Sequence, residues 1–112
     1  GTMEVGGTVN DAWDPEHMLM VATEACHFNT LHAIARYSKL PLKAYRSSSE
    51  GFLTKEKGKG YRFEKIIIRP VLTVAEGDEA KAERLLQKAH DVCLISRSFN
   101  FPVEVEHEIV TE

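Results

Sequence analysis

The sequence predicts an α+β domain in which an antiparallel sheet packs on a long buried helix, with a second helix beside it. Two segments, residues 15–39 and 78–92, space their apolar residues as helices do. Residues 43–74 have the pattern of a β-hairpin, and residues 102–110 alternate apolar with acidic residues. The strands do not alternate regularly with helices, so we expect no parallel β-α-β unit. With 112 residues, one domain spanning residues 1–112 is expected.

A long helix is predicted from Pro15 to about Lys39. Asp14 is a favourable N-cap, proline suits the first helical position, and Glu16 lies where the helix dipole stabilises an acid. The segment has no internal glycine or proline and is apolar on most sides, which is typical of a helix buried in a core or an interface. Cys26 is therefore expected to face inward or into a cleft. Helical spacing places it on one face with Met18, Leu19, Ala22, Ala25 and Asn29.

The hairpin is predicted to pair residues 43–54 with residues 61–74 through the polar turn KEKGKG. The preceding helix should end at Leu40-Pro41-Leu42, because the residue before a proline disfavours the helical conformation. The β-branched run Ile66-Ile67-Ile68 can be buried on both faces of a sheet. Residues 1–13 are rich in Gly and Thr, have no periodicity, and are expected to be a lead-in.

The second helix, residues 78–92, should bury a stripe that ends at Cys93 near its C-terminus. The stripe comprises Ala82, Leu85, Leu86, Ala89 and Cys93. The last segment should form a half-exposed strand, in which Val103, Val105, His107 and Ile109 alternate with glutamates. A thin sheet and one nearly all-apolar helix leave surplus apolar surface, so a homodimer is expected.

Composition excludes several classes of protein. The net charge of -3 makes a nucleic-acid partner unfavourable. No apolar run approaches the roughly eighteen residues that span a bilayer, and the start of the chain has no signal-peptide pattern, so we expect a cytoplasmic protein without a membrane partner. Two cysteines are too few for a secreted disulfide framework. They are either buried core thiols or a pair that reacts together.

A thiol acts as a nucleophile only as its thiolate, and the sulfenic acid that it forms with a peroxide is protected when a second thiol condenses with it. Cys26 and Cys93 lie on inward faces of two different helices and would form such a pair if these helices pack together. The residues alone leave inert core thiols as an open alternative. Five histidines invite a metal reading: His17, His27, His32, His90 and His107. His90 and Cys93 are one helical turn apart, but no further Cys lies within short spacing and structural zinc sites need four ligands, so no metal or other cofactor is expected.

Two stretches resemble signatures of the OsmC/Ohr family of thiol peroxidases. NDAWDPEHMLMVATEACHF is similar to the family's first motif, and AHDVCLISRSF to its second, in which a Val-Cys pair is followed by a Ser three residues after the Cys. The resemblance extends over residues 10–110 and implies an OsmC-like fold that forms an intertwined dimer. It also implies a peroxidatic Cys26, a resolving Cys93, and an acidic residue at Glu16 that in the family holds an arginine against the thiolate.

The resemblance implies an enzyme that reduces hydroperoxides, organic ones above all, with an external thiol or dithiol as reductant. The family's arginine comes from an N-terminal β region that is largely absent here, and residues 1–13 contain no Arg or Lys. We therefore expect the pKa of Cys26 to lie near that of a free thiol, about 8.5.

Two points remain open from the sequence. Glu16 precedes Cys26 by ten residues, or about 15 Å of helix, so it acts across a dimer interface, orients a long arginine, or only stabilises the helix dipole. The alternative to the enzyme is a dimeric OsmC-like binding or scaffold domain without efficient turnover, and a third reading is a generic α+β domain with inert cysteines.

Overall fold

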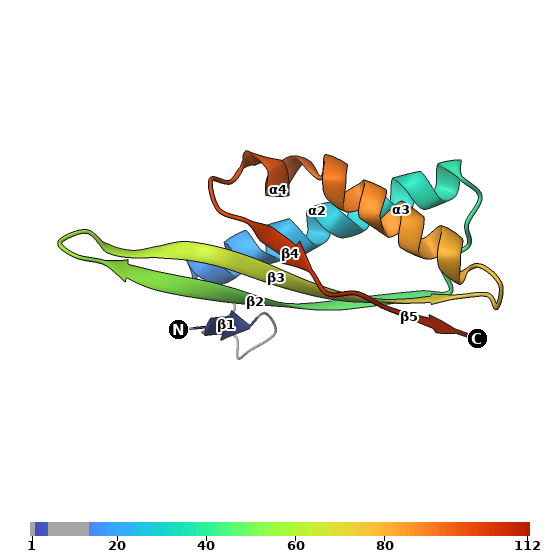
Figure 1. Cartoon of the computed structure of the whole chain (residues 1–112), viewed down its shortest axis with the longest axis horizontal. Helices are drawn as coiled ribbons and strands as arrows, with labels where there is room; N and C mark the ends of the chain where they lie inside the picture. Colours follow the sequence, from blue (N-terminus) through green and yellow to red (C-terminus); the bar gives the residue numbers. More distant parts are fainter. Residues whose placement is uncertain (1, 5–13) are drawn as a thin grey trace.

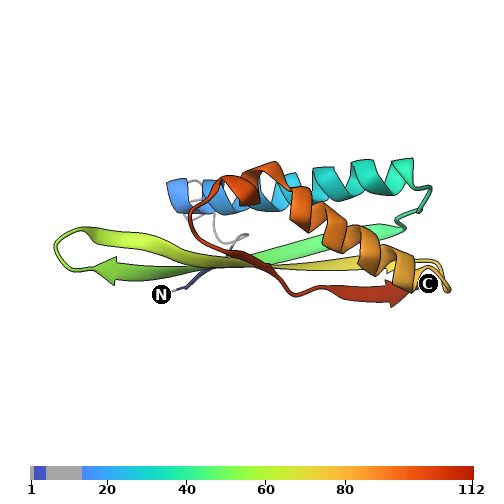
Figure 2. The same cartoon turned by 45° about the horizontal axis from the view of Figure 1, so that its top comes forward.

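The computed structural model describes residues 2–4 and 14–112 and has two layers, with the helices on one face of a five-stranded sheet (Figures 1 and 2). The predicted α+β class is confirmed. Within the described ranges, no helix combines the length and apolarity needed to cross a bilayer. The elements in chain order are β1 (Thr2–Glu4), α2 (Pro15–Tyr37), β2 (Ala44–Glu56), β3 (Gly60–Val74), α3 (Glu79–Val92), α4 (Leu94–Ser98), β4 (Val103–Val105) and β5 (Glu108–Thr111).

Helix α2 begins as predicted but buries a different face. Asp14 caps it, because its Oδ1 accepts a hydrogen bond from the backbone N–H of His17 at 2.8 Å. The expected inward face was wrong: Met18 is 52% exposed, and Ala22 and Asn29 are exposed too. When a helix is apolar on most sides, hydrophobicity alone does not show which side is buried. Here the buried side of α2 also includes polar residues. The buried residues are His17, Met20, Thr23, Glu24, His27, Leu31 and Ala35.

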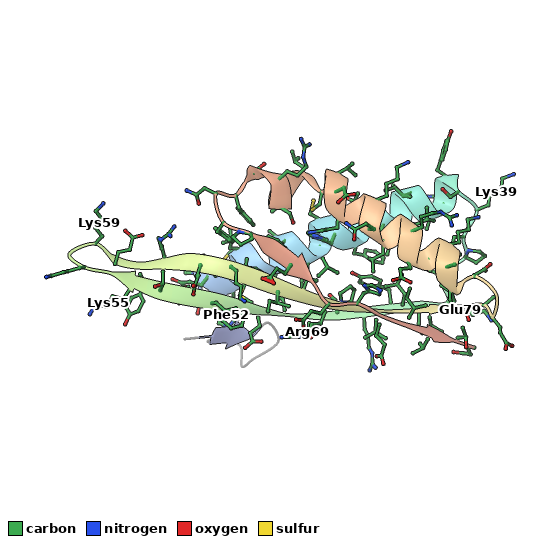
Figure 3. All side chains as sticks on the ribbon, viewed as in Figure 1. Lys39, Phe52, Lys55, Lys59, Arg69 and Glu79 are labelled. Carbon is green, nitrogen blue, oxygen red and sulfur yellow. The ribbon has the colours of Figure 1, made fainter. Side chains whose placement is uncertain are left out.

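The predicted hairpin is confirmed as β2 and β3, which pair antiparallel from Ala44 opposite Thr73 to Glu56 opposite Gly60. Gly58 lies in the tight turn and Gly60 directly after it, and their φ angles are positive, at 78° and 84°. Glycine adopts this conformation at low cost. Ile66-Ile67-Ile68 is buried as expected. The hairpin extends beyond the helical layer, and Lys55 and Lys59 lie at its tip (Figures 1 and 3).

The last segment differs from the prediction in direction. β4 and β5 both pair parallel to β3, so the sheet is not wholly antiparallel, and β3, α3 and β4 form the β-α-β unit that was not expected. The helices carry the chain back across the sheet, which makes the next strand run in the same direction as β3. Ile68 O accepts from Glu106 N at 2.9 Å, but the next donor position on β3 is Pro70, which has no N–H. The ladder is therefore interrupted between β4 and β5.

Residues 1–13 were expected to be a lead-in, but residues 2–4 form strand β1, which pairs antiparallel with β2, with Thr2 opposite Phe52. These residues lack the alternation of apolar and polar side chains that is typical of a strand, but hydrogen bonding between main chains does not require it. Residues 1 and 5–13 of this predicted lead-in lie outside the described residues.

Two apolar clusters hold the layers together at the two ends of α2. Leu31 and Ala35 pack with Leu72 of β3 and Leu86 of α3, whereas Met20 packs with Ile66, Ile68 and Val103. The predicted stripe of α3 is buried, with Ala82 and Cys93 fully enclosed. The middle of α2, which carries Cys26, therefore lies between two packed regions.

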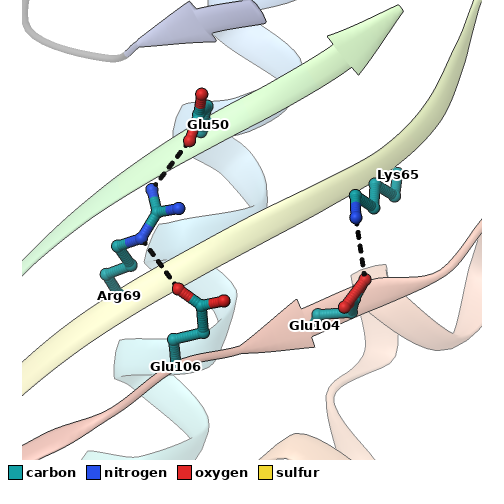
Figure 4. A network of polar contacts seen from close by, with 5 residues as sticks. All are labelled: Glu50, Lys65, Arg69, Glu104 and Glu106. Carbon is teal, nitrogen blue, oxygen red and sulfur yellow. Dashed lines mark hydrogen bonds and ion pairs between the residues drawn. The ribbon is translucent and has the colours of Figure 1, made fainter.

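The other face of the sheet carries charged residues. Arg69 pairs with Glu50 of β2 and with Glu106, each at 3.0 Å, and Lys65 of β3 lies 3.6 Å from Glu104 (Figure 4). Because successive side chains of β3 point to opposite faces of the sheet, the face under the helices is apolar and the opposite face carries these charges.

Candidate active site

The two cysteines meet where α2, α3 and α4 converge. Cys26 is half-buried in the middle of α2, and Cys93 is fully buried at the residue that ends α3 and begins α4. Both are free thiols, and the Cys93 thiol donates to Cys26 Sγ at 3.2 Å. The sequence-based expectation that the two helices bring these residues together agrees with this geometry.

The backbone at Cys93 explains how this contact forms. Cys93 has φ −64° and ψ 116°, an extended conformation that breaks the helix and lets α4 start in a new direction. The break turns the N–H groups at the start of α4, those of Leu94 and Ile95, toward Cys26. Arg97 N donates to Cys93 O at 3.0 Å, which closes the first turn of α4.

Cys26 is the more acidic thiol. Partial burial alone would raise its pKa, but the backbone N–H of Ile95, the Cys93 thiol and the N–H of Leu94 donate to its sulfur and together lower the pKa below its usual value. The sequence-based argument considered only an arginine, whereas backbone amides supply donors here that no residue type reveals.

Cys93 is shifted in the opposite direction. Burial raises the pKa of its thiol, and the adjacent Cys26 adds to this, against opposing hydrogen bonds from Ser96. When the pair loses one proton, Cys26 is therefore the residue that becomes the thiolate, while Cys93 keeps its proton. In this state the half-buried sulfur is the nucleophile and the buried sulfur is its hydrogen-bond donor.

A pair of histidines, the buried His27 and the half-buried His90, lies beside Cys93. His27 Nδ1 lies 3.0 Å from the carbonyl oxygen of Thr23 and 3.4 Å from Cys93 Sγ. His27 Nε2 lies 2.9 Å from His90 Nδ1, and the two rings stack with centroids 5.2 Å apart. Burial lowers the pKa of His27, and the neighbouring His90 also lowers it, against the hydrogen bond to Thr23. The ring is thus held neutral.

The tautomer of His27 follows from its partners. A carbonyl oxygen only accepts, so Nδ1 carries the hydrogen toward Thr23, and Nε2 of the neutral ring is left as an acceptor. His90 must then donate through Nδ1. Sequence reasoning considered these histidines only as metal ligands; the available signals were that His27 adjoins Cys26 and that His90 lies one turn before Cys93. Among the described residues, no three His, Cys, Asp or Glu side chains are arranged to hold a metal ion.

Glu24 is a second group that the sequence analysis did not identify. Its carboxylate is buried between α2 and β2, where Oε1 accepts from Ser47 Oγ at 2.6 Å and Oε2 from Ser49 Oγ at 3.0 Å. Tyr45 lies nearby, and burial together with the Glu24 charge raises its pKa to about 12. Two hydroxyl donors satisfy the carboxylate and attach the middle of α2 to the sheet.

Glu16, the third residue implied by the resemblance, is not brought to the cysteines. It lies in the first turn of α2, and no described cation pairs with its carboxylate. In the same turn, the backbone and side chain of His17 donate to Asp14 and lower the pKa of that carboxyl group. His107, expected within the last strand, lies between β4 and β5 and pairs with Glu83 at 3.4 Å.

Comparison with known proteins identifies relatives that match most of the chain. Residues 8–108 match the family model described as OsmC-like protein. The chain is 33% identical over 99 residues to the uncharacterized protein YmaD of Bacillus subtilis, covering 85% of this chain and 65% of that protein. It is 30% identical over 104 residues to an organic hydroperoxide resistance protein of Xanthomonas axonopodis, covering 91% and 70% of the two chains.

The fold gives the same relationship. An OsmC-like protein of unknown function from Vibrio cholerae has a solved structure that superposes with a TM-score of 0.73 at 26% identity, covering 84% of this chain and 63% of that one. The chain thus spans slightly less than two thirds of the length of YmaD and of the Vibrio protein.

Proposed function

The chain belongs to the OsmC-like protein family, and from this premise we propose that it is a thiol peroxidase that reduces hydroperoxides, organic ones above all, through Cys26 and Cys93. The observation that carries the proposal is the pair of sulfur atoms 3.2 Å apart with opposite pKa shifts. A relative 30% identical to this chain is named an organic hydroperoxide resistance protein, which supports the substrate class.

In the first half-reaction the Cys26 thiolate attacks one oxygen of the peroxide. The O–O bond breaks, the sulfur is oxidised to sulfenic acid, and the peroxide is reduced to an alcohol once its leaving oxygen gains a proton. The half-buried sulfur is accessible to a substrate, and the amides of Ile95 and Leu94 stabilise its thiolate before the reaction.

In the second half-reaction Cys93 attacks the oxidised sulfur of Cys26. A disulfide forms, the S–O bond breaks, and the hydroxide leaves as water with the proton of the Cys93 thiol. An external thiol or dithiol then returns both cysteines to the reduced state, without a bound cofactor. A cytoplasmic location would suit this cycle, because cytoplasmic reductants keep thiols reduced.

We also propose a homodimer. The outward side of α2 exposes Met18 and Val21 at 52% and 46%, and the nearby Leu94 is 69% exposed, which leaves an apolar surface for a second copy to cover. Glu16 lies on the same helix and would act across that interface, with an arginine of the other copy as its partner. Light scattering at micromolar concentration should give a dimer, and a monodisperse monomer would refute this assembly.

A steady-state assay tests the proposed activity. The protein, a dithiol reductant and cumene hydroperoxide should give sustained peroxide loss, faster than with hydrogen peroxide at equal concentration. Peroxide loss no faster than in a protein-free control would reject the enzyme and favour a binding or scaffold domain.

A further inference from the structure

We propose that His27 is a catalytic residue of the resolving step, in which its Nδ1–H stabilises the thiolate of Cys93, and that His90 positions it. This inference rests on the proposed function, since it assigns a role within the second half-reaction. The Cys26 thiolate forms without the contacts of these two side chains.

The contacts of His27 fix the position of its hydrogen. Nδ1 lies 3.0 Å from Thr23 O and 3.4 Å from Cys93 Sγ, so one N–H lies between a carbonyl oxygen and a sulfur. The carbonyl cannot donate, which places the hydrogen on Nδ1 rather than on Nε2. His27 is thus oriented as a donor toward Cys93 and not as a base that would remove its proton.

His90 keeps this orientation. It lies on α3 one turn before Cys93, and its Nδ1–H donates to His27 Nε2 at 2.9 Å. If His27 changed to the other tautomer, two N–H groups would face each other at this distance. The hydrogen bond from His90 therefore selects the tautomer that presents a donor to the sulfur.

Cys93 loses its anionic neighbour after the first half-reaction. In the reduced pair its proton is shared with the Cys26 thiolate, but oxidation to sulfenic acid removes that anion. Cys93 must then attack as a thiolate from a buried position, where an anion is disfavoured. Its proton goes to the hydroxide that leaves Cys26, and the new charge on Cys93 forms against His27 Nδ1–H and the donors of Ser96.

The test measures Cys93 without peroxide. An aromatic disulfide reagent such as dithiobis(nitrobenzoate) reacts with Cys26, releasing one coloured thiolate and leaving a mixed disulfide. Cys93 then attacks the Cys26 sulfur and expels a second coloured thiolate, and the rate of this second phase reports the nucleophilicity of Cys93. Because the reagent replaces the peroxide, failure of the proposed peroxidase function would not hide the result.

The variant His27→Leu should slow the second phase about tenfold or more, as expected when one hydrogen bond to a charged group is lost. The variant His27→Asn places an amide N–H near the position of Nδ1 and should recover most of the rate. His90→Leu should slow the second phase several-fold, because it leaves the tautomer unselected. Circular dichroism and urea unfolding of each variant separate these effects from loss of the fold.

The pH dependence gives a readout that a purely structural role would not change. The second-phase rate rises with the Cys93 thiolate, and its midpoint should move to higher pH in His27→Leu. The ionisable groups that contact His27 and Cys93 are Cys26 of α2, which the reagent blocks, and His90 of α3.

Equal second-phase rates and midpoints in the wild type and a folded His27→Leu variant would overturn the inference. If that variant does not fold, His27→Asn and His27→Gln are compared instead, since glutamine places its amide near Nε2 rather than Nδ1. The inference requires the glutamine variant to be the slower of the two, and equal rates would reject it.

Discussion

Cys26 and Cys93 carry the same side chain and are in contact, yet their pKa values move in opposite directions. Cys26 is half-buried and accepts hydrogen bonds from the N–H groups at the start of α4, whereas Cys93 is fully buried and donates a hydrogen bond to Cys26. Burial disfavours the thiolate at both positions and is deeper at Cys93, where the hydrogen bonds from Ser96 do not outweigh it, whereas the donors at Cys26 do. The comparison teaches that the order of reaction in a thiol pair depends on the depth of burial and on where hydrogen-bond donors point, not on the residue type.

The largest expected effect comes from removing the acidic member of the pair. Cys26→Ser should lower peroxide reduction on the order of a thousandfold or more, because a serine hydroxyl is not ionised near neutral pH. Peroxide consumption measured with a dithiol reductant tests this. Substantial activity in the variant would mean that Cys93 attacks peroxide itself, and the assignment of the two roles would be reversed.

Removing the buried member should have a different outcome. Cys93→Ser should consume about one peroxide per chain rapidly and then stop or slow, because no second thiol condenses with the sulfenic acid at Cys26. Mass spectrometry should then show sulfinic acid at Cys26 after excess peroxide. If Cys93→Ser turns over at the wild-type rate with a dithiol, Cys93 has no resolving role.

The contrast between the two thiols depends on the packing that encloses Cys93. Leu86 of α3 is 4% exposed and packs near Leu31 of α2. Leu86→Ala should lower the free energy of unfolding by about 2–5 kcal/mol, because it leaves a cavity between these helices. Urea unfolding measures this, and alkylation of Cys93 should become faster. A loss below about 1 kcal/mol would show that the helix contact is not a main support of the site.

Alkylation against pH measures the two pKa shifts separately. The thiolate fraction rises with pH, so Cys93→Ser should expose a Cys26 midpoint below that of an unperturbed thiol, because the N–H groups of Leu94 and Ile95 remain as donors. In Cys26→Ser the midpoint of Cys93 should lie above that value, because burial remains after the neighbouring thiol is removed. The reverse order of midpoints would contradict the comparison.

The smallest effect is expected on the charged face of the sheet, and it serves as the control. Arg69→Ala removes exposed ion pairs with Glu50 and Glu106, so the free energy of unfolding should fall by less than about 1 kcal/mol. Neither thiol midpoint should move, since Arg69 lies on the face opposite the helices (Figure 3). A shift in either midpoint would show that the sheet transmits charge effects to the site.

Patterns that depend on side chains alone were predictable. The N-cap of α2, the approximate bounds of α2 and α3, the hairpin and the buried stripe that ends at Cys93 follow from local spacing and turn chemistry, and the family resemblance pointed to both thiols as candidates. The parallel direction of β4 was not predictable from local alternation, because alternation is the same in parallel and antiparallel strands. It depends on the path of α3 and α4.

The remaining features of the site depend on the backbone and on tertiary contacts. The lowered pKa of Cys26 arises from the N–H groups of Leu94 and Ile95, which any residue type would supply. Glu24 is a buried acid because Ser47 and Ser49 face it from β2, and sequence spacing within α2 cannot indicate partners on another element. The expectation for the pKa of Cys26 considered only an arginine and did not include these backbone donors.

The most direct test of the thiol peroxidase mechanism is a titration of free thiols before and after one equivalent of cumene hydroperoxide, without reductant. Wild-type protein should lose both thiols per chain as the peroxide disappears, and peptide mapping should find a disulfide between Cys26 and Cys93. Two thiols still free beside unconsumed peroxide would contradict the account.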